Sequence, residues 1–140
     1  MGVSSELWWP KPAAGDIVWC HFPHLPATVP GPKPRPALVV RVFEDSNTRY
    51  RVLLAYGTSQ KIRTLRAGEF AIAAQDRTAY RLSGLSFDTK FNMKEVGELA
   101  YNATWFKVPP HAPCGQLSRM GMLHPSLVQR AAAAWNAVQS

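Results

Sequence analysis

Apolar residues occur along most of this chain in short runs of strand length, bounded by proline, glycine and polar residues. Runs rich in β-branched and aromatic residues between such boundaries are typical of β-strands. The pattern predicts strands at Ile17–Phe22, Ala37–Phe43, Arg49–Ala55, Glu69–Ala74, Leu85–Phe91 and Val96–Tyr101. A further short run, Trp105–Val108, is predicted to close the strand set. The chain is therefore predicted to be mainly β.

Only the C-terminal segment has helical spacing. Its apolar residues recur three and four positions apart, at Leu127, Val128, Ala131, Trp135 and Val138. Pro125 suits the first position of a helix, where no N–H is required, so a helix with one apolar face is expected over about 125–138. Many short strands and one C-terminal helix predict an α+β fold, a small, strongly bent antiparallel sheet or partly closed barrel with the helix packed outside it or over one end. Residues 15–140 are predicted to form this single domain, preceded by an N-terminal leader over 1–14.

Proline and polar residues mark the connections. Six prolines between Phe22 and Ala37 forbid a regular ladder there and predict a semi-rigid loop of the kind that often binds ligands. Residues 44–47 predict the turn of a hairpin between the second and third strands. The later strands are expected to be separated by Asp76, Gly84, Asn92 and Asn102. Residues 61–66 are expected to be a basic loop or a short strand, and 109–121 a second loop.

Composition narrows the class of partner. The chain has 140 residues, with 16 lysines and arginines against 9 aspartates and glutamates, a formal net charge of +7. Such a charge favours RNA or DNA over acidic small molecules, although it does not separate nucleic acid from an acidic protein. Cys20 and Cys114 stand far apart, so no zinc knuckle or disulfide framework is expected, and a reducing cytoplasm fits best. No apolar run reaches the roughly 18 residues of a membrane-spanning helix. We expect no metal and no cofactor.

A rigid cation precedes the second strand. Pro34 and Pro36 fix their own φ angles and bias the preceding residues toward extended geometry, so Arg35 has few backbone states to lose when it binds a ligand. Arg35 is either an ordinary solvated charge or a fixed cation aimed at a phosphate.

Hydroxyl groups follow the third strand at Thr58 and Ser59. Antiparallel neighbours place the start of one strand beside the end of the next, so Arg35 and Thr58 can share one rim. A guanidinium and a hydroxyl there can stabilise the charge that builds on a phosphate during strand cleavage. In RNA the substrate's own 2′-hydroxyl can be the nucleophile. The alternative is that Thr58 and Ser59 only form a hydrogen-bonded turn.

Three motifs resemble the MazF/PemK toxins of bacterial type II toxin–antitoxin systems. They are Gly15-Asp16-Ile17-Val18-Trp19, Lys33-Pro34-Arg35-Pro36-Ala37-Leu38-Val39-Val40, and Thr58-Ser59 after an apolar strand. The resemblance covers about residues 15–101. It implies a small SH3-like, partly closed antiparallel barrel with a C-terminal helix. It also implies a homodimer that cleaves single-stranded RNA without a metal, leaves 2′,3′-cyclic phosphate and 5′-hydroxyl ends, and is inhibited by a cognate antitoxin protein.

By position, the resemblance implies that Arg35 is the catalytic arginine and Thr58 the catalytic threonine, with Ser59 lining the site. The family commonly has an apolar pair such as Pro-Ile before the threonine, whereas this chain has Tyr56-Gly57.

Further side chains are candidates for substrate binding. They are Lys33, Lys61, Arg63 and Arg66 as cations for flanking phosphates, Tyr56 as a base-stacking ring, and His24. The cations are equally explained as a solvated face, and Trp19, Phe43 and Trp105 are expected in the core. His21 or His24 can serve as an acid or base if it reaches the rim, although such histidines are more often exposed or capped.

Two other function classes stay open. One is a non-catalytic member of the same fold, akin to the CcdB-type toxins that bind DNA gyrase, or a module that binds nucleic acid or protein. The other is a chromatin-like reader, which requires several aromatic residues on one rim.

Overall fold

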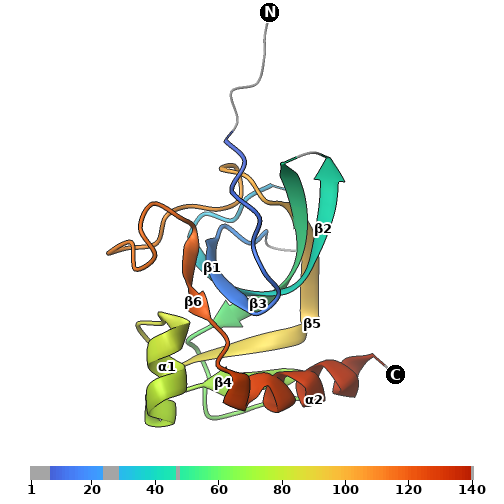
Figure 1. Ribbon diagram of the computed structural model, residues 1–140. Helices are drawn as coiled ribbons and strands as arrows, with labels where there is room; N and C mark the ends of the chain where they lie inside the picture. The colour runs from blue at the N-terminus through green and yellow to red at the C-terminus, as the bar shows by residue number, and fades with distance from the viewer. Residues whose placement is uncertain (1–6, 24–28, 47, 140) are drawn as a thin grey trace, which may run out of the picture.

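Within the part of the chain that the structure describes, six strands form one antiparallel sheet in the order β4-β5-β3-β2-β1-β6 (Figure 1). The computed structural model describes residues 7–23, 29–46 and 48–139. Its strands are β1 (Asp16–Cys20), β2 (Arg35–Ser46), β3 (Arg49–Thr58), β4 (Glu69–Ile72), β5 (Thr89–Ala100) and β6 (Arg119–Met122). Its helices are the 3₁₀ turns η1 (Ala74–Asp76) and η2 (Pro125–Leu127), α1 (Arg77–Ser83) and α2 (Val128–Val138). The prediction of a mainly β, α+β fold with a C-terminal helix is confirmed.

The hairpin of β2 and β3 is longer than predicted. β2 continues through most of the expected turn to Ser46, because Glu44 pairs with Tyr50 and Ser46 with Arg49 of β3. The prediction of a turn that begins at residue 44 is therefore wrong. At the other end of the hairpin, β2 already begins at Arg35 and β3 runs on to Thr58.

One long strand, β5, replaces the two predicted strands Leu85–Phe91 and Val96–Tyr101. Asn92 was expected to end a strand, but its side-chain oxygen instead accepts a hydrogen bond from the Lys94 N–H at 2.9 Å. The pairing with β3 jumps here, so that residues 93–95 bulge out of the ladder. The strand therefore bends sharply without ending (Figure 1).

Two elements lie where the sequence predicted connections. Residues 77–83 form α1, which is too short to show a helical period and ends at Gly84 in the left-handed region (φ 71°). The predicted loop over 109–121 runs into β6, which pairs with β1. Conversely, Trp105–Val108 is not a strand but contributes one isolated bridge, from Phe106 to Cys20.

Each face of the sheet covers its own hydrophobic core. On one face Ile17 and Phe91 pack with the helices, and α2 contributes Ala131 and Ala134 but leaves Val128 half exposed, contrary to prediction. On the other face Val18 and other β-strand residues pack against Trp9, Tyr101 and Phe106.

The predicted leader is in part a component of the domain. Trp9 is buried in the second core, where its Nε1–H donates to the Phe106 carbonyl at 3.3 Å. The first six residues of the leader lie outside the described part of the chain. No helix among the described residues is long and apolar enough to cross a membrane.

Candidate functional site

Arg35 and Thr58 lie at the same end of two neighbouring strands. Ala37 on β2 pairs with Tyr56 on β3, and the same register continued by two residues sets Arg35 opposite Thr58. Arg35 also pairs with Cys20 of β1. The antiparallel topology therefore brings the cation and the hydroxyl to one rim of the sheet, as the order of the strands predicted.

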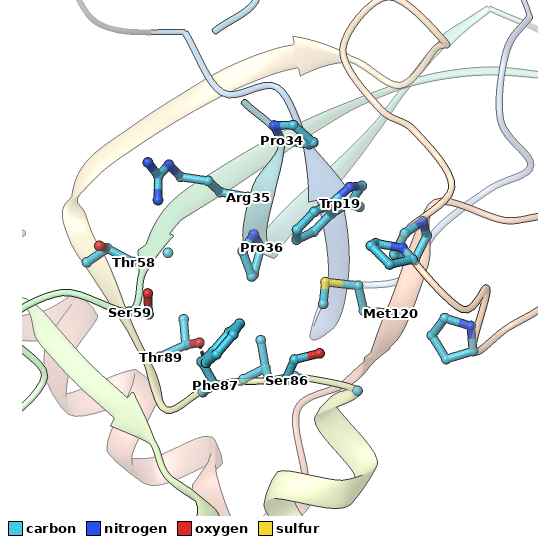
Figure 2. A pocket seen from close by; sticks show the side chains of 16 residues that line it. Trp19, Pro34, Arg35, Pro36, Thr58, Ser59, Ser86, Phe87, Thr89 and Met120 are labelled. Atoms are coloured by element: carbon cyan, nitrogen blue, oxygen red, sulfur yellow. Dashed lines mark hydrogen bonds between the residues drawn. The ribbon is translucent and has the colours of Figure 1, made fainter. Parts of the chain in front are cut away.

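A cavity of about 260 Å³ opens at this rim (Figure 2). Its polar lining includes Arg35, Thr58 and Ser59, and its aromatic lining is Trp19 and Phe87. Prolines supply much of the remaining wall, namely Pro34, Pro36, Pro109, Pro110 and Pro113. A cation and hydroxyl groups thus stand beside flat apolar surfaces.

Arg35 is available to an anion. It is partly exposed, and none of the ion pairs within the described ranges involves it. Two other arginines do have a carboxylate partner, since Arg51 pairs with Glu98 at 2.8 Å and Arg130 with Asp76 at 3.2 Å. Burial raises the pKa of the Cys20 thiol, so the residue paired with Arg35 stays neutral and offers no competing charge.

Gly57 on β3 explains how closely the neighbouring strands β2 and β5 approach β3. A Cβ at this position would lie 2.6 Å from the Pro36 carbonyl oxygen and 2.9 Å from the Phe91 ring. Real side chains do not tolerate such contacts, so only glycine lets β2 and β5 approach β3 at this point. The departure from the apolar pair of the MazF/PemK pattern therefore has a local packing reason.

The Thr58 hydroxyl accepts a hydrogen bond within a turn, and its own O–H can still donate to a ligand. Its Oγ1 accepts a hydrogen bond from the Gln60 N–H at 3.1 Å, which is the turn alternative raised by the sequence. A hydroxyl has one donor in addition to its acceptor capacity, so the proton of Thr58 stays available to a ligand. The structural and the chemical interpretation are compatible.

A buried ion pair anchors the segment from Ser59 to Gly68, which is a loop as expected. The Lys90 Nζ donates to Glu69 Oε1 at 3.1 Å and to the Thr64 carbonyl at 3.0 Å, and the Arg66 N–H donates to the same Glu69 oxygen. Burial by itself raises the pKa of Glu69, but the Arg66 and Lys90 hydrogen bonds outweigh it and lower the pKa. Lys90, which the sequence analysis missed, is opposite Thr58 in the sheet and so fixes the loop next to the site.

The structure does not bring every predicted cation to the cavity. Lys33 and Lys61 are exposed and are not among its lining residues. Arg63 borders a separate polar hollow together with Asp76 and Asp88. Arg66 is exposed, and its backbone is used to hold Glu69. None of these four side chains lines the cavity.

Tyr56 and His21 also do not line the cavity. Tyr56 is partly buried and packs on Phe22, with ring centroids 5.4 Å apart, against the second core. The Nδ1 of His21 lies 2.8 Å from the Gly31 carbonyl oxygen, a capped arrangement that ties down the proline-rich loop. His24 falls outside the described residues. Phe43, expected in the core, is 37% exposed.

Sequence reasoning missed the aromatic residues of the cavity. Trp19 was assigned to the core, and it does contact the first core, but it also lines the cavity. Phe87 was placed inside a predicted strand, whereas it lies in the connection between α1 and β5 and is 71% exposed. The available signal was Gly84 before it and Asp88 after it, which are turn-forming residues.

Within the described part of the chain, no group of three or more His, Cys, Asp or Glu side chains is placed to hold a metal ion. The chain matches no protein-family model, and no curated protein matches it. The class that fold and site define is a small α+β protein with a basic, aromatic-lined cavity at a sheet rim.

Proposed function

We propose that this protein is an endoribonuclease of the MazF/PemK type, which cleaves single-stranded RNA without a metal ion. One observation carries the proposal: an unpaired guanidinium, Arg35, and the hydroxyls of Thr58 and Ser59 line a single cavity. The net charge of +7 supports a polyanionic substrate.

The proposed reaction is an internal transfer. The ribose 2′-oxygen forms a bond to the adjacent phosphorus and loses its proton, while the bond to the 5′-oxygen breaks and that oxygen gains a proton. The products are a 2′,3′-cyclic phosphate and a 5′-hydroxyl. The substrate supplies the nucleophile, so the protein has only to bind the phosphate and stabilise its growing charge.

Arg35 and Thr58 have distinct parts in this proposal. The guanidinium donates forked hydrogen bonds to non-bridging oxygens and assists proton transfer, and the Thr58 hydroxyl donates to the same phosphate. Ser59 contacts the substrate beside them. The exposed Lys33, Lys61 and Arg63 contact phosphates of the RNA farther from the cleaved bond.

The proposal extends to partners and location. A protein antitoxin with an acidic segment covers the basic rim, the active form is a homodimer, and both act in the cytoplasm. An acidic segment competes with RNA because both present anionic groups to the same cations.

Cleavage of single-stranded RNA in the presence of EDTA tests the function. Arg35→Ala and Thr58→Ala are each expected to lower the cleavage rate by about 100- to 1,000-fold, the usual effect of removing one donor that stabilises a transition state. Arg77→Ala and Thr78→Ala are matched controls, because both residues are exposed on α1 and neither lines the cavity.

Activity that needs a metal, or that survives both site substitutions, would refute the mechanism. Intact RNA together with tight binding of a protein, or of nucleic acid with steep salt dependence, would instead indicate the non-catalytic binding module.

A further inference from the structure

Phe87 is the most exposed large apolar side chain of the described residues, at 71%. Burial of such a ring is favourable, so an exposed one at the edge of a cavity invites a ligand. The following residues, Asp88 and Thr89, are held by hydrogen bonds, so the exposure of Phe87 does not come from a loosely attached segment.

Hydrogen bonds fix the backbone on which Phe87 stands. The buried Thr89 Oγ1 donates to the Phe87 carbonyl at 2.8 Å, and the Asp88 carboxylate accepts from the Ala74 N–H at 2.8 Å. The ring is therefore presented from a pinned connection, which lowers the conformational entropy that a ligand has to remove.

The ring of Phe87 points toward the cavity from the segment before β5, with Trp19 on the far side and Arg35 and Thr58 at one end (Figure 2). A flat apolar surface beside a fixed cation matches the two chemical parts of a nucleotide, the base and the phosphate. The volume of about 260 Å³ is just below the roughly 300 Å³ at which pockets for drug-sized ligands begin, so it suits one nucleotide rather than several.

We propose that this cavity is a subsite for one unstacked nucleobase, which stacks on Phe87 while its phosphate lies at Arg35. The inference rests on the proposed ribonuclease function and names a substrate-binding residue for it. The ring stacks any base, and the hydroxyls of Ser59 and Ser86, which also line the cavity, supply polar contacts that discriminate between bases. Phe87 thus takes the part that the sequence suggested for Tyr56, which packs against Phe22 instead.

The test uses a short RNA whose cleaved bond has first been mapped with the wild-type protein. A 2′-deoxy sugar at that position removes the nucleophile, so the dissociation constant is measured without turnover. Phe87→Ala is expected to weaken binding about 5- to 100-fold, the range that base–aromatic stacking provides. Phe87→Trp is expected to restore it. Phe43→Ala is the matched control, since Phe43 is an exposed phenylalanine on β2 that does not line the cavity.

Removal of single bases identifies the one that stacks. Abasic substitution at one position next to the cleaved bond is expected to weaken wild-type binding as much as Phe87→Ala does. The same abasic RNA is expected to bind Phe87→Ala no more weakly than the intact RNA does, because the two changes remove one interaction.

Different results would overturn the proposed ribonuclease function and the proposed base subsite. No cleavage of any single-stranded RNA by the wild-type protein would overturn the proposed function itself. Cleavage with unchanged RNA affinity of Phe87→Ala, or with fully additive effects of the abasic sites, would overturn only the base subsite.

Discussion

Replacement of Lys90 by methionine tests whether the buried ion pair holds the loop beside the cavity. The side chains of Lys90 and Glu69 are 8% and 9% exposed, so the substitution leaves a carboxylate with little access to water and without its cation. Breaking a buried pair by removing one partner typically costs about 3–5 kcal/mol. The pair lies under a surface loop and Glu69 keeps the Arg66 N–H, so we expect the lower end, about 3 kcal/mol.

Denaturant unfolding at pH 7 measures this free energy. Lys94→Met is the matched control, because Lys94 is an exposed lysine on the same strand, and it should change the free energy of unfolding by less than about 0.5 kcal/mol. Adding Glu69→Gln to Lys90→Met should recover part of the loss, because the amide oxygen still accepts from the Arg66 N–H but carries no charge.

The pH dependence gives an independent check with a definite sign. The folded-state pKa of Glu69 lies below its ordinary value of 4.5, so the unfolded chain binds the proton more tightly. The stabilisation is therefore fully present above about pH 4.5 and is lost as the pH falls through the folded-state pKa. Without Lys90, two of the causes that lower the Glu69 pKa are lost, so this contribution should become smaller. A loss below about 1 kcal/mol for Lys90→Met, with an unchanged acid profile, would refute the reasoning.

Two further outcomes follow from packing near the rim. Gly57→Ala should lower the free energy of unfolding by about 1–3 kcal/mol because the new Cβ overlaps a neighbouring carbonyl; Gly97→Ala, whose Cβ would meet Phe22 at an ordinary 3.4 Å, is the control in the same denaturation experiment. In native protein at pH 8, a thiol reagent should modify the partly exposed Cys114 but not Cys20, which is fully buried and has a raised pKa; rapid modification of both would contradict the buried position of Cys20.

The pattern of apolar residues predicted most of the strands, because the side chains that a sheet buries have to be apolar. It also predicted that Arg35 and Thr58 can share one rim of the sheet, because an antiparallel hairpin sets the start of one strand beside the end of the next. That part of the site depends on local sequence and on one pairing.

The remaining features depend on contacts between distant segments. Asn92 is a turn-forming residue, and only the pairing of β5 with β3 turns its hydrogen bond into a bulge within a strand. In the sequence, Lys90 is only a charge within an apolar strand. The structure places Glu69 of β4 beside it and so shows its role as an ion-pair partner. Phe87 looked like part of a strand core, and its exposure results from where α1 ends. Such outcomes require the tertiary structure, because no local propensity distinguishes them.

The positions of the cations explain more about the candidate site than their number does. Lys90, Arg51 and Arg130 each have a carboxylate partner, and the buried pair of Lys90 with Glu69 anchors the loop. Arg35 lies on a segment stiffened by two prolines and beside a neutral thiol, and it takes part in none of these pairs. The backbone of Arg35 is already ordered before a ligand arrives, so binding an anion loses little conformational entropy. With no carboxylate partner, the guanidinium therefore stabilises a bound anion more than it stabilises the fold. This is why the proposed chemistry is centred on Arg35 rather than on the more numerous exposed cations around it.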